Sequence, residues 1–323
     1  MIRISVVIPT CNRVDLLERC VAAITRQTLS PDEYELVVVD DGSSAATSAL
    51  IRKWQAHSRI AIRYVAIENG PRGPAAARNV GWHVGRAPII AFTDDDTIPA
   101  PDWLEQAIAG FRDVSVDAAW GRIVVPLPST PTDYERDTAG LETAGFVTAN
   151  CFVRRSVLER LGGFDEAFRS AWREDSDLYF RLLRGGQRVR YLPNAAVEHP
   201  VRRAPWGVSV LQQRKASYDA LLYRKHPELF RQYVTPARPW QYYPIVLALT
   251  GMGVGAALGR RTLTEVAGAA WLVLTLRFAM QRLRATSRAP THVAEMLATS
   301  AVIPPLSILH RTRGAIRHGV LFW

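Results

Sequence analysis

Short apolar runs alternate with amphipathic segments over the first 125 residues of the chain. Runs of about 4–8 residues rich in Val, Ile and Phe are typical of buried strands, and apolar residues repeating every three to four positions are typical of helices. The pattern predicts strands at 4–8, 36–39, 60–67, 89–92 and 118–125 and helices at 16–24, 46–55, 74–84 and 101–111. This alternation favours an α/β fold with a mostly parallel, doubly wound sheet flanked by helices.

The pattern is less regular between residues 126 and 199. Residues 126–140 are rich in Pro and Thr, a composition that predicts a mobile loop. Two further strands are predicted, at 146–153 and 187–192. Two helices are predicted, one from Arg155 and one at 178–183, with a turn at 162–165 between them. We expect this compact domain, residues 1–200, to end just after His199.

The chain becomes basic and apolar after Pro200. Residues 208–224 have the spacing of a basic amphipathic helix within an extension that covers 201–235. The tail, 236–323, begins with 19 uncharged residues at 241–259. Their length just suffices to cross a bilayer, but Pro and Gly residues weaken them as a straight helix. Two more apolar stretches follow, a short one at 266–276 and one at 293–309 that is interrupted by Pro304-Pro305.

Charge is unevenly divided along the chain. Residues 1–199 hold 23 Lys and Arg against 26 Asp and Glu, a net of −3, whereas residues 200–323 hold 17 against 4, a net of +13. A basic tail indicates an anionic partner. An anionic membrane surface is favoured over nucleic acid, because the basic residues lie in an apolar tail and not on a patterned polar face.

Three cysteines, Cys11, Cys20 and Cys151, are odd in number and unpatterned. They indicate a reducing compartment with neither a disulfide framework nor a cysteine metal cluster. No secretory signal is recognised at the start, where Met1-Ile2-Arg3 leads directly into a strand. We therefore expect the N-terminal domain to stay in the cytoplasm.

Polar clusters follow three of the predicted strands, at 9–13, 40–43 and 94–96. Ligands of doubly wound sheets bind at the carboxyl ends of the strands, so we expect these clusters to share one edge. The three carboxylates of Asp94, Asp95 and Asp96 repel each other unless a cation lies there, and a divalent metal carrying a diphosphate would supply one. The alternatives are a solvated acidic turn at 94–96 and a helix N-cap turn at 40–43.

Six motifs follow one another in a fixed order: SVVIPTCNR at 5–13, ELVVVDDGS at 35–43, AAARNVG at 75–81, FTDDD at 92–96, GGFDEAF at 162–168 and WREDSDL at 172–178. In this order and spacing they resemble family 2 glycosyltransferases with the Rossmann-like GT-A fold, of the bacterial type with a membrane-associating C-terminal tail. The resemblance covers about residues 3–200. It implies a hexosyltransferase-type enzyme that transfers a sugar from a nucleoside diphosphate donor with inversion, and it makes residues 1–200 the nucleotide-sugar-binding catalytic domain.

The resemblance also implies which residues bind the donor. The loop that receives the base and diphosphate is matched by Pro9, Thr10, Asn12 and Arg13. Asp41 matches the carboxylate that bonds the base, and an acceptor there suits the N–H of uracil or guanine, so that a UDP or GDP donor is expected. Arg78 and Asn79 match a position that faces the nucleotide; the alternative for Arg78 is a solvated side chain on a surface helix.

Asp94 and Asp96 form a D-x-D pair, and alternate positions of an extended segment point the same way. The resemblance implies that Asp96 binds Mn²⁺ or Mg²⁺ and that Asp94 bonds the ribose or a metal-bound water. Asp95 is expected to bond the donor sugar or to cap the next segment. His199 is the candidate to complete the metal shell, with an ordinary surface or core histidine as the alternative.

Glu174-Asp175 matches the family's acidic pair, in which Glu174 would face the nucleotide sugar. Asp175 would be the general base that takes the proton from the acceptor hydroxyl. The alternative is structural, since acidic residues favour the first turn of a helix. The family often has a small residue before this pair, where this chain has Arg173.

The tail suggests where the enzyme works. If 241–259 and 266–276 both spanned a bilayer, Arg260-Arg261 would lie on the far side, against the positive-inside tendency. The second stretch is also too short to cross a bilayer, so we expect a peripheral or monotopic enzyme on the cytoplasmic face of the cell membrane. Basic residues would contact anionic lipid heads, namely Arg277, Arg282, Arg284 and Arg288. A soluble helical subdomain or an oligomer interface is the alternative, and the oligomeric state is open.

The leading hypothesis is thus a metal-assisted transfer to a lipid-linked or cell-envelope glycan acceptor. A nucleotidyltransferase would be expected to carry a Gly-rich, Lys-containing loop after the first strand, which the sequence lacks. A catalytically silent nucleotide-sugar or membrane-binding module is disfavoured by the presence of Asp94, Asp96 and Asp175. The sequence leaves the donor sugar, the nucleotide and the acceptor open.

Overall fold

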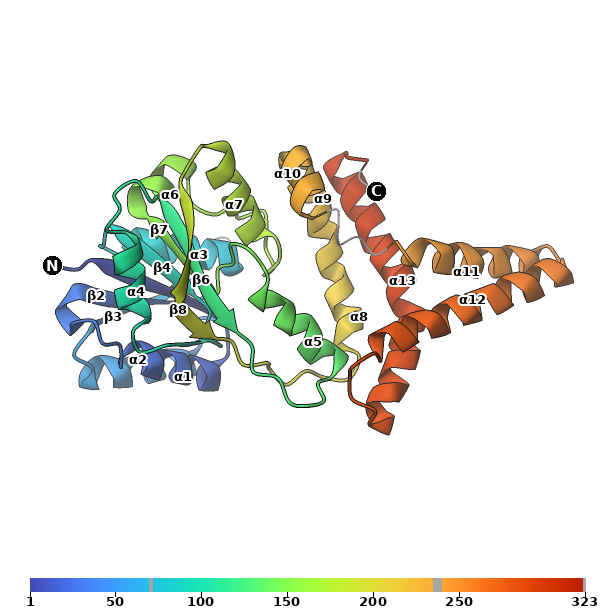
Figure 1. The fold of residues 1–323 in the computed structure, drawn as a ribbon, viewed down its shortest axis with the longest axis horizontal. Helices are drawn as coiled ribbons and strands as arrows, with labels where there is room; N and C mark the ends of the chain where they lie inside the picture. The colour runs from blue at the N-terminus through green and yellow to red at the C-terminus, as the bar shows by residue number, and fades with distance from the viewer. Residues whose placement is uncertain (70–71, 235–239, 322–323) are drawn as a thin grey trace. The chain divides into compact units, whose positions relative to one another are not determined.

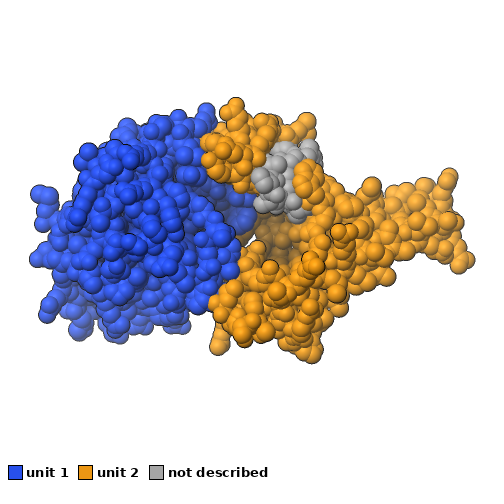
Figure 2. All heavy atoms as spheres, in the orientation of Figure 1, with its two compact units in different colours: residues 1–126, 139–202 blue, residues 127–138, 203–323 orange. Residues whose placement is uncertain are grey.

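The computed structural model describes residues 1–69, 72–234 and 240–321 (Figure 1). The chain divides into two compact units, which are coloured separately in Figure 2: residues 1–126 with 139–202, and residues 127–138 with 203–323. The first unit is an α/β structure and the second is mainly helical. The boundary expected between residues 235 and 236 lies outside the described residues.

The first unit is built on an eight-stranded sheet in the order β3-β2-β1-β4-β7-β6-β8-β5. Its strands are β1 (Ile4–Thr10), β2 (Tyr34–Asp40), β3 (Ala61–Ala66), β4 (Ile89–Thr93), β5 (Ile98–Pro99), β6 (Ala118–Val124), β7 (Asn150–Arg154) and β8 (Val189–Glu198). The strands from β3 to β4 pair in parallel, β7 is antiparallel to both of its neighbours, and β6 and β8 pair in parallel. A mostly parallel sheet flanked by helices confirms the predicted fold class.

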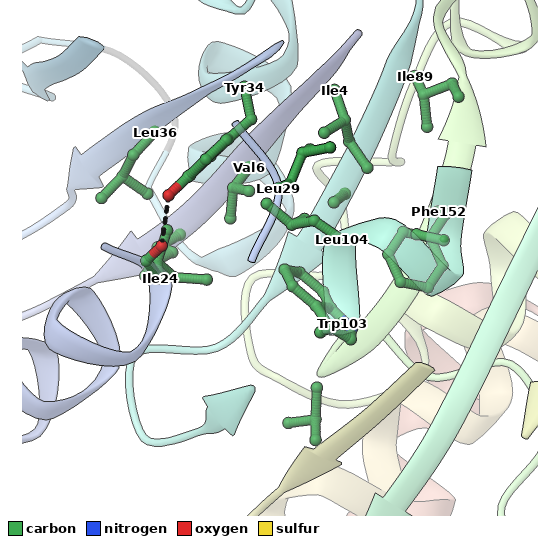
Figure 3. Packing of buried hydrophobic residues seen from close by; sticks show 14 of the residues in the cluster. Ile4, Val6, Ile24, Leu29, Tyr34, Leu36, Ile89, Trp103, Leu104 and Phe152 are labelled. Carbon is green, nitrogen blue, oxygen red and sulfur yellow. Dashed lines mark hydrogen bonds between the residues drawn. The ribbon is translucent and has the colours of Figure 1, made fainter. Parts of the chain in front are cut away.

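Helices cover both faces of this sheet (Figure 1). One face packs against α1 (Val14–Ile24), α2 (Ala45–His57) and α4 (Trp103–Gly110), and the other against α3 (Pro74–Val84), α6 (Arg155–Leu161) and α7 (Glu174–Arg184). Figure 3 shows the first of these cores, where the hydroxyl of Tyr34 donates to the carbonyl of Ile24 at 2.9 Å. Strands buried on both faces have nearly continuous apolar sequences, which explains the runs in this chain.

The prediction of a mobile loop at 126–140 is wrong, because a helix, α5 (Asp133–Ala139), and a 3-10 turn (Gly140–Glu142) occupy much of it. A capping box starts the helix. The backbone N–H of Glu135 donates to Thr132 Oγ1 at 3.2 Å, and the N–H of Thr132 donates to Glu135 Oε2 at 2.6 Å. This reciprocal pair satisfies backbone groups at a helix start despite the surrounding prolines.

Three other boundaries of the first unit differ from the prediction by at least four residues. β7 begins at Asn150 and not at 146, because Phe146, Val147 and Ala149 pack into apolar clusters without pairing as a strand. α7 begins at Glu174, four residues before the predicted start, with acidic side chains in the first turn that favour the positive end of the helix dipole. β8 continues to Glu198, six residues beyond the predicted end of the strand at residue 192.

The second unit consists of helices, and three predictions about it are wrong. Its later helices are α8 (Val208–Gln212), α9 (Ser217–Lys225), α10 (Pro227–Tyr233), α11 (Tyr242–Ala257), α12 (Arg261–Arg282) and α13 (Pro290–His318). The single helix expected at 208–224 is interrupted by a 3-10 turn at 213–216. α12 is 22 residues long, twice the predicted stretch, and α13 continues through Pro304-Pro305. Burial of Ile303 and Pro304 supports α13 where the missing N–H groups weaken it.

Arg282 is an interior residue of this unit. Its Nη2 lies 2.7 Å from Asp133 Oδ2, and its Nη1 donates to Thr299 and Ser300. The side chain is only 8% exposed. The expectation that Arg282 faces lipid heads is therefore wrong, because a buried guanidinium needs a carboxylate partner and finds one in Asp133.

Two helices, α12 and α13, are long and apolar enough to cross a membrane by length and composition, which by itself is weak evidence. Only 17% of the apolar window of α12 is buried within the structure, against 39% for α13. α11, at 16 residues, is shorter than either. It packs beside α12 with small residues between them, since a Cβ on Gly255 would lie 2.8 Å from the backbone nitrogen of Thr264.

Candidate active site

A pocket opens in the first unit where β1, β2 and β4 end. It is lined by Pro9, Thr10, Cys11, Arg13, Asp41, Gly73, Pro74, Ala77, Arg78, Asp94, Asp96, Ala171, His199 and Arg202. The parallel pairing of β1 with β2 and β4 brings the three strand-end clusters to one edge. The predicted gathering of these clusters is thus present, and His199 and Arg202 join them from the end of β8.

Most of the predicted site residues line this pocket, but four do not. The four predicted site residues that are absent from the lining are Asn12, Asp95, Glu174 and Asp175. Asn12 is exposed, has a φ of 55°, and has its amide against Gly42, where a Cβ would approach Asn12 Oδ1 to 2.7 Å. Asn79 is also absent from the lining, because its side chain bonds Phe164 and Glu166 and so fastens the GGFDEAF turn to α3.

The three adjacent aspartates have different partners. Asp94 Oδ1 accepts from Arg78 Nη2 at 2.7 Å. Asp95 Oδ2 accepts from Thr10 Oγ1 at 2.7 Å. Asp94 and Asp95 thus have different hydrogen-bond partners. These partners offset part of the repulsion among the three adjacent negative charges.

Asp95 is fully buried and ties the loop after β1 to β4. Arg13 Nε lies 3.0 Å from Asp95 Oδ2, beside the hydrogen bond from Thr10. Burial raises the pKa of Asp95 to about 7, and the charge of Arg13 only partly opposes it. In this conformation Asp95 positions Thr10 and Arg13.

Asp96 faces a histidine and two arginines. Its Oδ1 lies 3.6 Å from His199 Nε2, and its Oδ2 lies 2.9 Å from Arg202 Nε and 4.0 Å from Arg13 Nη1. Asp94, Asp96 and His199 each offer a ligand atom within 4.8 Å of the others. Two carboxylates and an imidazole are a donor set that suits a divalent cation such as Mn²⁺.

Arg78 links the two acidic motifs. It is 2% exposed, so the alternative of a solvated surface arginine is wrong. Its Nη2 binds Asp94 and its Nη1 lies 3.0 Å from Glu174 Oε1. Burial raises the pKa of Asp94, but the charge and hydrogen bond of Arg78 outweigh it and bring the pKa below the ordinary value.

The pair Glu174-Asp175 occupies the first turn of α7. Burial raises the pKa of Glu174 to about 7 against the lowering effect of Arg78. Burial also raises the pKa of Asp175, whose Oδ1 accepts from the backbone N–H of Ser176 at 2.6 Å. A half-buried carboxylate such as Asp175, with a raised pKa, is better suited to accept a proton than a solvated one.

Arg173, just before this pair, has a φ of 75°. This left-handed conformation is one that glycine adopts at no steric cost, which explains why a small residue suits the position. The guanidinium of Arg173 lies 4.7 Å from the ring centroid of Trp172, a cation–π contact that compensates part of the strain.

The two aspartates after β2 differ in their roles. Asp40 is fully buried, and its carboxylate accepts from the N–H groups of Gly42 and Ser44 and from the hydroxyl of Tyr64. Asp40 therefore stabilises the turn, and Ser44 caps the N-terminus of α2. This agrees with the alternative prediction of a helix N-cap turn after the second strand. Asp41 instead lines the pocket: its Oδ2 accepts from the N–H of Gly73 at 2.9 Å. Its buried Oδ1 has no hydrogen-bond partner in the described part of the chain.

Sequence reasoning missed Arg202 as a residue of the pocket. Arg202 follows β8 three residues after His199 and pairs with Asp96. The signal available in the sequence was a basic pair, Arg202-Arg203, directly after the candidate ligand His199. Its position next to Asp96 depends on the pairing of β8 with β5 and β6, which local sequence does not specify.

Comparisons with known proteins agree on one family. The model of glycosyl transferase family 2 matches residues 5–164, and that of glycosyl transferase family group 2 matches residues 89–306. The chain is 32% identical over 222 residues to the glycosyltransferase AglE of Haloferax volcanii, covering 65% of this chain and 70% of that protein.

Another relative is longer than this chain. The chain is 27% identical over 271 residues to a validoxylamine A glucosyltransferase of Streptomyces hygroscopicus, covering 70% of this chain. It spans only 57% of the length of that relative.

The fold has a counterpart of known structure. It is similar to the mannosyltransferase PcManGT from Pyrobaculum calidifontis, solved in complex with GDP-Man and Mn²⁺, with a TM-score of 0.58 at 22% identity. The alignment covers 98% of this chain and 86% of that one. The family group 2 model spans more than half of the residues, and the strand-end pocket lies on a matching fold. The chain therefore belongs to the family 2 glycosyltransferases, with the GT-A fold.

Proposed function

We propose that this glycosyltransferase moves a sugar from a nucleoside diphosphate sugar to an acceptor hydroxyl, with inversion and with help from Mn²⁺ or Mg²⁺. The observation that carries the proposal is the group Asp94, Asp96 and His199, gathered within 4.8 Å at the strand-end pocket. The presence of GDP-Man and Mn²⁺ in the PcManGT complex supports the same class of donor and metal.

The residues present fit a divalent cation. His199 is buried and its Nδ1 has no hydrogen-bond partner among the described residues, so no bond there restricts which nitrogen is protonated. Asp96 is compensated by Arg202 and Arg13, which indicates that positive charge is needed at this place. Asp94, Asp96 and His199 would hold the ion. When bound, it would offset the negative charge on the departing diphosphate.

Asp41 is suited to recognise the base. Gly73 fixes one carboxylate oxygen and leaves the other, Oδ1, free to accept from a ligand N–H. Uracil and guanine each present such an N–H, which supports a UDP or GDP donor. Arg13 and Arg202 line the same pocket, and guanidinium groups bind phosphate oxygens well.

Asp175 is proposed as the general base. Its side chain would accept the proton of the acceptor hydroxyl while the hydroxyl oxygen forms a bond to the anomeric carbon. The bond from that carbon to the diphosphate oxygen breaks on the opposite side, and the electron pair leaves with the diphosphate. Glu174 and Arg78 act as positioning residues, since their ion pair and the bond from Arg78 to Asp94 join the base turn to the donor site.

Features of the second unit support the proposal that the enzyme acts at a membrane. They also support an acceptor that is lipid-linked or part of the cell envelope. Large apolar side chains are exposed along α11 and α12, with Leu247 at 75% and Val266 at 65%. A tail with a net charge of +13 would be attracted to anionic lipid heads. We place the enzyme on the cytoplasmic face as a peripheral or monotopic protein, in keeping with the charge asymmetry.

The test is hydrolysis and transfer with a panel of UDP- and GDP-sugars, each with Mn²⁺, with Mg²⁺ and with EDTA. We expect one donor class to be used and EDTA to abolish turnover. Asp175→Asn should lower transfer by about 10²–10⁴-fold while leaving nucleotide affinity, measured by calorimetry, unchanged. Full turnover in EDTA would remove the role given to Asp96, and full transfer by Asp175→Asn would remove the base.

A further inference from the structure

The first unit contains a second cavity, of about 260 Å³, that shares no lining residue with the pocket described above. It is lined by Trp120, Gly121, Ile123, Leu141, Glu142, Thr143, Ala144, Gly145, Val147 and Tyr191. None of these residues lines the pocket proposed to bind the donor or belongs to the group proposed to hold the metal. The cavity is therefore available for another component of the reaction.

Two aromatic rings form one wall. Trp120 on β6 and Tyr191 on β8 are opposite each other in register, with ring centroids 5.5 Å apart and planes inclined by 38°. Trp120 is partly exposed and Tyr191 is 44% exposed. Trp120 also packs edge-on against Tyr179, which stacks on Phe146 at 5.6 Å. The aromatic wall is thus held rigidly by the sheet and by α7 before any ligand arrives.

One wall of the cavity contacts the helix that carries the proposed base, because Trp120 packs against Tyr179 of α7. Tyr179 lies four residues after Asp175 in α7, and residues so spaced are neighbours on one face of a helix. Cys151 is the cross-strand partner of Trp120 on β7, and the charge of Asp175 contributes to the raised pKa of that thiol after the larger effect of burial. The aromatic wall and Asp175 therefore border the same part of the first unit.

The rest of the lining identifies the kind of ligand. Ile123 and Val147 provide apolar surface, and Glu142 provides one carboxylate, whose Oε1 is fixed by the N–H of Val125 at 2.7 Å. No basic side chain is among the lining residues, so a phosphate group would meet repulsion and no compensation. The volume lies just below the usual range of about 300–1,000 Å³ for ligand pockets, which suits one ring better than a long chain.

We propose that this cavity is an acceptor subsite that binds a sugar or cyclitol ring without negative charge. The apolar C–H face of such a ring packs on Trp120 and Tyr191, and its hydroxyl edge donates to Glu142. Occupation of the subsite directs a hydroxyl of the same acceptor toward Asp175. This inference rests on the proposed glycosyl transfer and adds the chemical class of the acceptor to it.

The test uses the full-length protein and five probes: methyl α-glucoside, myo-inositol, glucosamine, glucose 1-phosphate and decanol. Binding is measured by saturation-transfer NMR without donor, and the acceptor KM is measured separately from the donor KM. We expect the uncharged and amine-bearing rings to bind and glucose 1-phosphate to bind at least tenfold more weakly. Tyr191→Ala, at an exposed position, should raise the acceptor Kd and KM at least tenfold, and Glu142→Lys should reverse the preference toward glucose 1-phosphate.

Val114→Ala is the control, because Val114 is 86% exposed in the same unit and lines neither cavity. Unchanged acceptor KM in both Tyr191→Ala and Glu142→Lys would overturn the subsite, as would displacement of the rings by decanol or equal binding of glucose 1-phosphate. Donor hydrolysis separates the two proposals. A wild-type enzyme that hydrolyses a nucleotide sugar but binds no ring refutes only the subsite, whereas absence of hydrolysis and transfer with every donor refutes the proposed function.

Discussion

At the scale of single residues, the site depends on carboxylates whose neighbours give them different proton affinities. Arg78 lowers the pKa of Asp94 below its ordinary value, while burial raises the pKa of Asp175 and brings that of Glu174 to about 7. One buried guanidinium thus serves two carboxylates unequally, because burial and the charge of Asp175 raise the pKa of Glu174, whereas Arg13 adds to the lowering of the pKa of Asp94. Separated proton affinities are what an ionised donor site and a nearby proton acceptor require.

The raised pKa of Glu174 predicts a pH dependence of stability. Its ordinary value is 4.5, and the folded value is about 7. Between these two values the folded state binds a proton that the unfolded state has lost, so stability falls as pH rises through this window. Urea unfolding at pH 4.5 to 8 should therefore show a steeper decline for the wild type than for Glu174→Gln.

Glu105→Gln is the matched control, since Glu105 is an exposed residue of α4. It should decline with pH as the wild type does. If Glu174→Gln and the wild type have parallel curves, Glu174 is ionised throughout the range and the ion pair with Arg78 determines its charge.

At the scale of elements, the start of α3 connects the fold to the proposed donor site. Gly73 precedes the helix with a φ of 111°, and its N–H donates to Asp41. A Cβ on Gly73 would lie 2.6 Å from the carbonyl oxygen of Arg169. The helix start, the chain before α7 and the proposed base-binding carboxylate therefore meet at one position where only glycine fits.

Gly73→Ala should lower the free energy of unfolding by about 1–3 kcal/mol through backbone strain. It should also weaken UDP or GDP binding, because the N–H that orients Asp41 has to move. Urea unfolding and calorimetry measure the two effects.

Gly140→Ala is a suitable control, since a Cβ there meets nothing within 4 Å and Gly140 has no positive φ. It should change neither quantity beyond error. Wild-type stability and affinity in Gly73→Ala would show that Asp41 is oriented by other contacts.

At the scale of the whole molecule, the two units differ in how much apolar surface they expose. The first unit covers a mostly parallel sheet with helices on both faces and buries its large apolar residues. The second exposes apolar side chains along α11 and α12 and belongs to the part of the chain with a net charge of +13. Exposed apolar helices flanked by arginines are the composition expected of a bilayer-binding element.

Glutamate at exposed apolar positions should therefore weaken membrane binding. Leu247→Glu in α11 and Val266→Glu in α12 are expected to lower binding to phosphatidylglycerol vesicles at least tenfold, about 1.4 kcal/mol each. Co-sedimentation at low salt, without detergent, is the measurement. Val114→Glu, at an exposed position of the first unit, is the control and should bind as the wild type does. Wild-type protein that stays in solution with these vesicles would favour a soluble subdomain or an oligomer interface.

The sequence by itself determined most of the first unit. Strands and helices there follow from local periodicity, and α3 occupies the predicted 74–84. The gathering of the clusters after β1, β2 and β4 also followed, because parallel strands present their carboxyl ends at one edge. These features depend on contacts within short segments or on a general rule of sheet topology, and both can be recognised in one sequence.

Only the tertiary structure decided which partners each of several adjacent side chains contacts. Asp94, Asp95 and Asp96 are adjacent in sequence, yet their partners come from α3, from the loop after β1 and from the end of β8. Arg202, the cavity beside Trp120, and the continuation of α13 through Pro304-Pro305 likewise depend on distant packing. The physical reason is that side-chain charge and burial are set by neighbours that long-range folding supplies, whereas backbone periodicity is set locally.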